Sequence, residues 1–308
     1  MPARLFLSSG DLIADRRYEF ARDLQLKGDL VAAAEVFEQA IELAPGFVSA
    51  WFTLGEIRQQ LGQQDAAIAA FRRARDADAA DPHGASLKLM HLGAEELSAM
   101  PPAYVRTLFD QYAPRFDRAL IDDLGYRGPS LLFKAVLAAR HAVRKPAFFK
   151  RAIDLGCGTG LAASAFARDV DHFTGIDLSP GMIEQARQTR LYAELEVGDM
   201  LEGLRTKPDA CADLVLAADA MVYVADLVPV LTEVRRVLAA GGLAAFTLER
   251  NSGEGVILGA GLRYAHGVPY VRASLAAAGL ELSQIEEQSF RNENNNPVPG
   301  LVVVAAKS

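Results

Sequence analysis

This sequence is short of cysteine, of tryptophan and of long apolar runs. Its 308 residues include two cysteines, Cys157 and Cys211, and a single tryptophan. Two cysteines cannot build a disulfide framework, which is typical of a reducing compartment, so we expect a cytoplasmic protein. A chain of this length buries enough of its surface on folding to need neither disulfides nor a structural metal.

Membrane and secretory signals are also missing. The most apolar stretch, residues 210–225, is interrupted by Asp213 and Asp219, so no helix is expected to span a membrane. Residues 1–10 contain only a short apolar run, too short for the core of a signal peptide. The five histidines are scattered and neither cysteine has the spacing of a metal ligand, so no metal site is expected.

The chain has no excess of basic charge. Its 32 Lys and Arg residues and 39 Asp and Glu residues give a net charge of −7, which is unfavourable for binding a nucleic-acid backbone. One basic stretch between Asp123 and Asp154 contains no acid and consists of Arg127, Lys134, Arg140, Arg144, Lys145, Lys150 and Arg151. It is either a solvated face or a basic rim that attracts an anionic substrate.

An internal repeat occupies the N-terminal part of the chain. A shift of about 34 residues places Gly28 on Gly62, Ala33 on Ala67, Phe37 on Phe71 and Ala40 on Ala74. The periodicity predicts two pairs of amphipathic helices, over residues 13–30 with 30–43 and over residues 48–61 with 64–78. A further helix over residues 84–97 is expected to cap them, because two repeats alone are unstable.

This spacing, with Pro45 closing the first copy, resembles the tetratricopeptide (TPR) repeat. The resemblance implies an all-α, TPR-like domain over residues 1–98. Such repeats usually bind another protein, but a structural cap or a surface for self-association remains an open alternative. Residues 100–102, Met-Pro-Pro, mark the break before a second domain, residues 99–308.

The second half of the chain alternates between strands and helices. An apolar strand over residues 152–155 runs into Gly156, Gly158 and Gly160, and a helix over residues 161–168 follows. A glycine-rich turn between a strand and a helix lets backbone N–H groups approach a ligand closely. The motif is Asp-x-Gly-x-Gly-x-Gly, which differs from the G-x-G-x-x-G of dinucleotide-binding folds.

Further strands follow in order. They are expected over residues 172–177, 195–200, 212–217, 243–249, 280–290 and 300–306, with Asp177 and Asp199 at the ends of the second and third strands. The glycine motif, the two acids and the closing strand pair resemble the class I S-adenosylmethionine-dependent methyltransferases. The resemblance implies an α/β fold with a doubly wound, seven-stranded Rossmann-like sheet and an antiparallel last strand, preceded by the TPR-like helical domain.

The resemblance also implies S-adenosyl-L-methionine as the cofactor and S-adenosyl-L-homocysteine as the product. Asp177 is expected to accept the ribose hydroxyls, Asp199 the adenine amino group, and Met182 to pack on the adenine. Ser179 is expected to cap the helix that begins at Pro180. The implied cofactor-binding residues are Tyr112, Asp154, Gly156, Gly158, Gly160, Asp177, Leu178, Met182, Asp199, Met200, Ala218 and Tyr223.

The segment between the domains adds a more specific resemblance. This segment is similar to the helix that covers the cofactor in the ubiquinone/menaquinone-type branch. The residues that carry the similarity are Phe109-Asp110, Tyr112-Ala113 and residues 115–117. Together with the repeats it makes the chain resemble the TPR-containing methyltransferases. Tyr112 is implied as a contact of the cofactor carboxylate, or it is an aromatic side chain packed in a helical cap.

Methyl transfer is an in-line displacement, so catalysis can be largely positional. Ligands of open α/β sheets bind at the carboxyl ends of the strands. The candidate residues there are Asp219 and Tyr223 after the fourth strand, Glu249 and Arg250 after the fifth, and Tyr264 and His266 in a glycine-rich insertion over residues 253–267. That insertion is a flexible connection or a substrate lid, and His266 is a general base or a structural histidine.

The sequence lacks two signals of nucleic-acid methyltransferases: an Asn/Asp-Pro-Pro-Tyr string after the fourth strand and a Pro-Cys nucleophile. We therefore expect methyl transfer to an oxygen or nitrogen of a small metabolite, which the basic stretch allows to be anionic. The alternatives are a protein methyltransferase or an enzyme recruited by a partner of the TPR-like domain, and a non-enzymatic adaptor that binds the cofactor.

Overall fold

The computed structural model describes residues 5–113, 125–293 and 295–308. The chain divides into two compact units, residues 1–107 and residues 108–308. Each unit has its own apolar core. The boundary predicted after residue 98 comes from the repeat pattern and stays a prediction.

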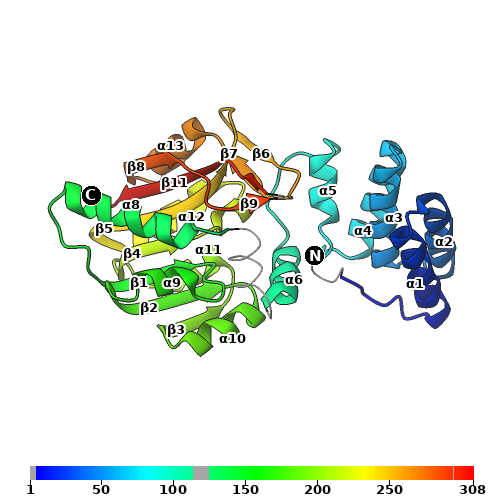
Figure 1. Ribbon diagram of the computed structural model, residues 1–308, viewed down its shortest axis with the longest axis horizontal. Helices are drawn as coiled ribbons and strands as arrows, with labels where there is room; N and C mark the ends of the chain where they lie inside the picture. Colours follow the sequence, from blue (N-terminus) through cyan, green and yellow to red (C-terminus); the bar gives the residue numbers. More distant parts are fainter. Residues whose placement is uncertain (1–4, 114–124, 294) are drawn as a thin grey trace. The chain divides into compact units, whose positions relative to one another are not determined.

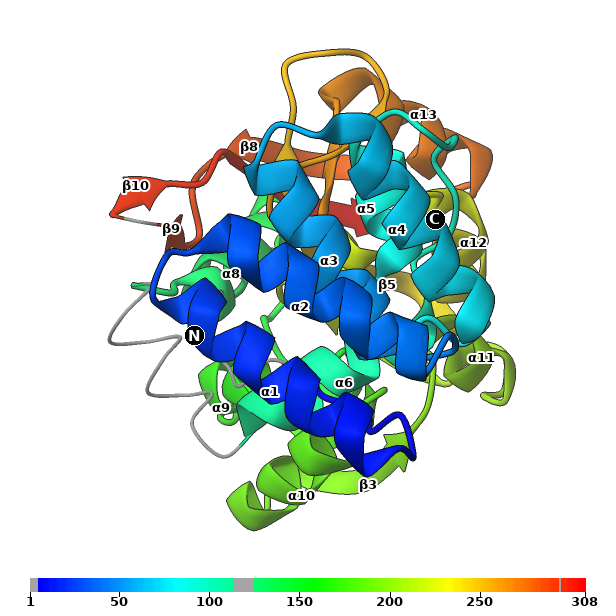
Figure 2. The same ribbon diagram turned by 90° about the vertical axis from the view of Figure 1, so that its right-hand side faces the viewer.

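Paired helices make up the first unit, and Figure 2 shows them side by side in chain order. They are α1 (Leu12–Leu26), α2 (Leu30–Leu43), α3 (Val48–Gln60), α4 (Gln64–Ala77) and the shorter α5 (Ala85–His91). The predicted helical hairpins are therefore present. The helix expected over residues 84–97 was predicted too long, because α5 ends at His91.

The cores of the helical hairpins combine large side chains with positions that have no room for one. Phe37 and Phe71 are fully buried, and each such side chain stabilises the fold by about 1.5–3 kcal/mol. A Cβ atom on Gly55 would lie 2.7 Å from Cε1 of Phe71. Any larger residue at this position would therefore push α3 and α4 apart.

A mixed sheet forms the centre of the second unit (Figure 1), in the order β3-β2-β1-β4-β5-β11-β8. Its strands are β1 (Phe149–Leu155), β2 (Val170–Asp177), β3 (Tyr192–Val197), β4 (Ala212–Ala217), β5 (Leu238–Arg250), β8 (Glu281–Glu287) and β11 (Gly300–Ala306). Strands β1 to β5 pair with one another in parallel, and β11 is antiparallel to both β5 and β8. The predicted doubly wound, seven-stranded sheet with an antiparallel last strand is confirmed.

Short strands add to this sheet. The glycine-rich insertion contains β6 (Val256–Leu258) and β7 (Tyr264–His266), which pair with each other, and β7 also pairs in parallel with the end of β5. The insertion is thus fixed to the carboxyl end of β5 by backbone hydrogen bonds. The segment before β11 contains a second small pair, β9 (Asn292–Glu293) and β10 (Asn296–Pro297).

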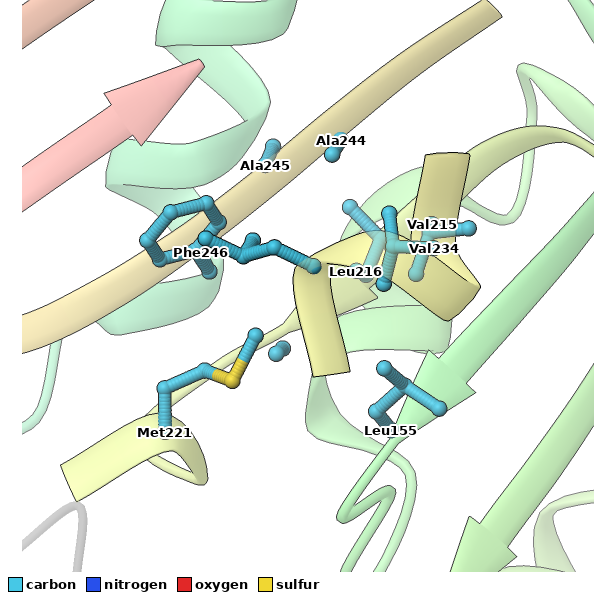
Figure 3. A pocket seen from close by; sticks show the side chains of 10 residues that line it. Leu155, Val215, Leu216, Met221, Val234, Ala244, Ala245 and Phe246 are labelled. Atoms are coloured by element: carbon cyan, nitrogen blue, oxygen red, sulfur yellow. The ribbon is translucent and has the colours of Figure 1, made fainter. Parts of the chain in front are cut away.

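Helices cover both faces of the sheet. The helices on one face are α8 (Gly128–Ala142) and α9 (Leu161–Phe166), and those on the other are α11 (Met200–Arg205), α12 (Leu227–Val237) and α13 (Val268–Ala277). Figure 3 shows a small gap between the sheet and α12 that is lined by apolar residues, among them Leu155, Met221 and Phe246. These side chains offer a ligand no hydrogen-bond partner, so the gap is part of the core.

No helix within the described residues combines the length and apolar character needed to cross a bilayer. Over the same three segments, no group of three or more His, Cys, Asp or Glu side chains is placed to hold a metal ion. Cys157 and Cys211 are free thiols, and burial raises the pKa of both.

Candidate functional site

The glycine-rich loop leaves the carboxyl end of β1 in a conformation that suits glycine. Gly156, Gly158 and Gly160 have φ angles of 62°, 54° and 97°, all in the left-handed region. A Cβ atom on Gly156 would lie 2.5 Å from the Cβ atom of Ala220. The loop therefore turns tightly against Ala220, three residues beyond the end of β4.

Asp177 ends β2 next to this loop. Its Oδ2 accepts a hydrogen bond from the Gly158 N–H at 2.8 Å, and its Oδ1 accepts one from the Ser179 N–H at 2.8 Å. Burial raises the pKa of Asp177, and the two hydrogen bonds oppose this rise. A carboxylate has about four acceptor positions, so Asp177 can still accept two hydroxyl groups.

Asp154 is the penultimate residue of β1 and is 1% exposed. Its Oδ2 accepts a hydrogen bond from the Tyr192 hydroxyl at 2.7 Å, whereas its buried Oδ1 has no hydrogen-bond partner among the described residues. Burial raises the pKa of Asp154 to about 7, although the Tyr192 hydrogen bond lowers it. A buried carboxylate oxygen without a partner is costly unless a donor or a cation fills the place.

The remaining implied cofactor residues lie at or just beyond the same strand ends. Asp199 caps α11, where its Oδ1 accepts hydrogen bonds from the N–H groups of Leu201 and Glu202 at 2.8 and 3.2 Å. Met182 is fully buried in α10 (Pro180–Thr189), so its contact with adenine stays a prediction. Leu178, Met200 and Ala218 are half-buried after β2, β3 and β4.

Helix α6 (Pro102–Tyr112) contains the implied lid residues. Asp110 accepts hydrogen bonds from the Ser179 hydroxyl and from the Gly181 N–H, the latter at 3.2 Å. The ring of Phe109 meets that of Tyr223 edge-on, with centroids 5.4 Å apart. The end of α6 is thus fixed to the start of α10 and to the segment after β4.

Ser179 was predicted to cap a helix, and Tyr112 to contact the cofactor from the lid. Ser179 caps α10 as expected, since its hydroxyl accepts a hydrogen bond from the Met182 N–H at 3.0 Å. Tyr112 is half-buried, and its contact with the cofactor carboxylate stays a prediction. Residues 115–117 of the lid string lie outside the described residues.

The four catalytic candidates fall into two pairs. Asp219 and Tyr223 are half-buried, whereas Tyr264 and His266 are fully buried. Nε2 of His266 donates a hydrogen bond to the Val224 carbonyl oxygen at 2.9 Å. Burial lowers the pKa of His266 to about 4, so this imidazole is neutral at pH 7. Its role as a base stays a prediction.

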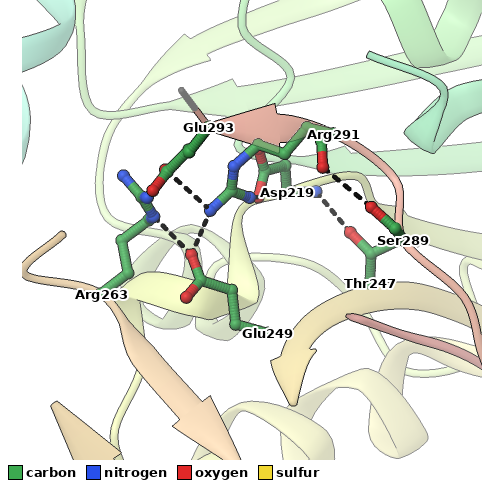
Figure 4. Close-up of polar contacts among 7 residues, drawn as sticks. All are labelled: Asp219, Thr247, Glu249, Arg263, Ser289, Arg291 and Glu293. Carbon is green, nitrogen blue, oxygen red and sulfur yellow. Dashed lines mark hydrogen bonds and ion pairs between the residues drawn. The ribbon is translucent and has the colours of Figure 1, made fainter. Parts of the chain in front are cut away.

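A charged network joins the carboxyl ends of β4 and β5 (Figure 4). Arg291, whose side chain is 3% exposed, donates to Asp219 at 2.6 Å and also to Glu249. Arg263 donates to Glu249 and to Glu293. Burial raises the pKa of Asp219 to about 6, and the two arginines oppose this rise.

Only part of this network was predicted from the sequence. Asp219 and Glu249 were predicted because they follow strands, but Arg263, Arg291 and Glu293 were missed. These three belong to the insertion and to the loop before β11, where no periodicity or motif marks an individual side chain. The network brings together residues up to 72 positions apart in the chain.

Four residues of the basic stretch lie away from this edge of the sheet. The backbone N–H groups of Lys150 and Arg151 donate to the Asp213 carboxylate, near the amino ends of β1 and β4. The Lys145 ammonium lies beside Gly241, near the start of β5. Arg140 is buried with its guanidinium over the ring of Phe149. These four residues therefore supply no basic rim at the carboxyl ends of the strands.

Comparison with known proteins agrees with this geometry. Residues 152–242, from β1 into β5, match the family model of a methyltransferase domain. This part of the chain is therefore similar to a methyltransferase domain. Residues 24–89 match the model of a tetratricopeptide repeat, so both implied domain types are confirmed.

Individual relatives match over part of their length. The chain is 32% identical over 148 residues to methyltransferase-like protein 27 of Homo sapiens, which is 47% of this chain and 57% of that protein. It is 35% identical over 65 residues to the 18S rRNA (guanine-N(7))-methyltransferase of Bos taurus, which is 20% of this chain and 23% of that protein. The chain thus spans less than two thirds of either relative.

One solved structure also aligns with part of this chain. The 1,6-didemethyltoxoflavin-N1-methyltransferase of Burkholderia thailandensis, crystallised with 1,6-didemethyltoxoflavin and S-adenosylhomocysteine, has a TM-score of 0.48 and 16% identity. The alignment covers 70% of this chain and 93% of that one. A likeness of this size carries no conclusion about the acceptor.

Proposed function

We propose that this protein is an S-adenosylmethionine-dependent methyltransferase that transfers the methyl group to an oxygen or nitrogen of a small metabolite. In this proposal residues 99–308 are the lid and catalytic domain and residues 1–98 the TPR-like domain. The observation that carries it is the buried, unpartnered Oδ1 of Asp154 beside the glycine-rich loop.

The residues at the strand ends fit the chemistry of this cofactor. Asp154 offers a carboxylate oxygen to the ammonium of the methionine part, Asp177 accepts from the ribose hydroxyls and Asp199 from the adenine amino group. Tyr112 donates to the cofactor carboxylate. When bound, S-adenosylmethionine supplies a methyl group on a positively charged sulfur, which an acceptor attacks in line.

Residues of this chain position the acceptor and accept its proton when the acceptor is protonated. Asp219 is the favoured base, because its carboxylate is half-buried, is oriented by Arg291 and has a pKa of about 6. It is therefore mostly ionised at pH 7. Tyr223, packed against Phe109, helps to keep water from the reacting atoms. An acceptor that is already an oxyanion needs no base.

Charge at this edge bears on the class of acceptor. The network contains three carboxylates and two guanidinium groups, and four residues of the basic stretch lie away from it. These observations favour an uncharged or cationic small molecule over the anionic metabolite that the sequence allows.

The lid residues Phe109, Asp110 and Tyr112 support a place in the ubiquinone/menaquinone-type branch.

Calorimetry with S-adenosylhomocysteine tests the cofactor assignment. We expect one molecule of this product to bind to each full-length chain. A chain that shows no heat of binding and no protection from thermal unfolding by the nucleoside would contradict the proposed function.

A second function has support from the helical unit. The side chains of Leu12, Ile13, Phe20 and Leu26 on α1 are between 56% and 76% exposed. Apolar side chains gathered on a surface are often binding sites. They favour an enzyme that binds a protein partner, which either recruits the enzyme or is methylated by it. The alternative is an enzyme that associates with itself. Sedimentation distinguishes these cases: a dimer that Phe20→Glu dissociates supports self-association, and a monomer supports recruitment.

A further inference from the structure

Tyr192 reaches Asp154 across an intervening strand. It begins β3 and pairs with Phe173 of β2, whereas Asp154 lies in β1 on the far side of β2. A Cβ atom on Gly175 of β2 would lie 2.9 Å from Cε1 of Tyr192, and one on Gly160 would lie 3.1 Å from Cε2. Both glycines therefore leave the space that the ring occupies.

The contact at the end of this ring is specific. The Tyr192 hydroxyl donates to Oδ2 of Asp154 at 2.7 Å and leaves Oδ1 without a hydrogen-bond partner in the described part of the chain. A carboxylate held at one oxygen cannot rotate freely, so the direction of its other oxygen is fixed. The two oxygens of Asp154 thus have different functions, one for the protein and one for a ligand.

We propose that Tyr192 is the positioning residue of the cofactor site, which holds the Asp154 carboxylate so that Oδ1 receives the ammonium group of the methionine part. This inference rests on the proposed function. Tyr192 acts through Asp154, and the proposal assigns it no contact with the cofactor.

The surroundings of Asp154 support a cationic ligand. The titratable groups that interact with it are Tyr192 of β3, Asp177 of β2, Cys157 of the glycine-rich loop and Tyr126 ahead of α8. None of the four is a cation, and burial raises the pKa of the thiol and of both phenols, so these stay neutral. An ammonium group would therefore be the positive partner of this carboxylate.

Protonation of Asp154 should compete with binding of that ammonium. Because burial raises the pKa of Asp154 to about 7, the free protein takes up a proton there as the pH falls below 7, and the ammonium then meets a neutral acid. Removal of the Tyr192 hydroxyl removes a hydrogen bond that lowers this pKa. The loss of affinity on acidification should then begin at a higher pH.

Two nucleosides separate this effect from a general loss of structure. S-adenosylhomocysteine carries the amino-acid part, and 5′-methylthioadenosine has the same adenosine and sulfur without it. Titration of Asp177, which is assigned to the ribose, would change the affinity for both probes. An effect that passes through Asp154 changes the affinity for S-adenosylhomocysteine alone.

The experiment measures the affinity of the full-length chain for both probes by calorimetry between about pH 5.5 and 7.5, below the pKa of the α-amino group. At pH 7 we expect Tyr192→Phe to weaken S-adenosylhomocysteine binding on the order of tenfold. It should also move the pH midpoint upward and leave 5′-methylthioadenosine binding unchanged. Tyr18→Phe, which removes a buried hydroxyl from the helical unit, is the control and should change neither affinity.

A second variant, Asp154→Asn, should lose most of the pH dependence toward S-adenosylhomocysteine and keep 5′-methylthioadenosine binding. Equal losses for both probes in Tyr192→Phe would show that the ring only supports the fold. Unchanged binding and an unchanged pH profile in that variant would also overturn the inference. A wild-type chain that binds neither nucleoside would instead contradict the proposed function itself.

Discussion

Asp154 and Asp177 are adjacent-strand carboxylates whose side chains are held in different ways. Backbone N–H groups of the glycine-rich loop and of Ser179 fix both oxygens of Asp177. A phenol from two strands away fixes one oxygen of Asp154. The orientation of Asp177 therefore depends on two neighbouring strand-to-helix turns, whereas that of Asp154 depends on the packing of β3.

Asp177→Ala should weaken binding of S-adenosylhomocysteine by on the order of 1–3 kcal/mol, because charge-assisted hydrogen bonds to the ribose are lost. Calorimetry at pH 7 measures this change. Asp171→Ala, an exposed residue on the same strand, is the matched control and should bind as the wild type does. An unchanged affinity in Asp177→Ala would contradict the ribose assignment.

His266 should make the fold sensitive to acid. Its pKa is about 4 in the folded chain and 6.5 in the unfolded one, so the unfolded state binds more protons between these values and stability is lost as the pH falls through this window. From pH 7.5 to 5 the loss amounts to about 2 kcal/mol. Urea unfolding of His266→Gln should show a shallower pH dependence than the wild type.

The same variant tests the predicted base. Methyl transfer that proceeds at the wild-type rate in His266→Gln would exclude His266 as the base. If instead the variant has the same pH dependence of stability as the wild type, the burial of a neutral imidazole at this position is contradicted.

At the scale of elements, the turn from β1 to α9 leaves little room for substitution. Gly156→Ala would place a Cβ atom 2.5 Å from Ala220 at a positive φ, and strain of this kind costs on the order of 1–3 kcal/mol. We expect thermal unfolding at a lower temperature and weaker S-adenosylhomocysteine binding. Gly46→Ala, where no atom lies within 4 Å, is the control, and equal behaviour of the two variants would contradict this account of the loop.

Most elements could be predicted from local pattern. The bounds of β4 and β11 are those expected from their apolar runs, and α2 agrees as well. The pairing of β7 with β5 could not be predicted, because short strands in a glycine-rich insertion have no alternation to mark them.

The candidate site shows the same limit. Asp154, Asp177 and Asp199 were found because each lies at or near the end of a strand. Tyr192 and Arg291 were missed, because their partners Asp154 and Asp219 are 38 and 72 positions away in sequence. Contacts of that range depend on sheet order and packing, which a single sequence does not display.

At the scale of the whole molecule, the two units should be separable in function. Deleting residues 1–98 should leave S-adenosylhomocysteine binding intact, because the implied cofactor residues all lie in residues 108–308 and that unit has its own core. Calorimetry and sedimentation of the truncated chain check this, and any partner binding or self-association should be lost. A truncated chain that neither folds nor binds the nucleoside would show that the repeats are structural.

Transfer of a labelled methyl group tests the central claim most directly. The full-length chain is incubated with methyl-labelled S-adenosylmethionine and a cell extract that is then separated into small molecules, protein and nucleic acid, with Asp177→Ala as the control. We predict label in the small-molecule fraction with the wild-type chain and much less with the variant. Label confined to protein or nucleic acid would contradict the proposed acceptor, and no label in any fraction would contradict the methyltransferase itself.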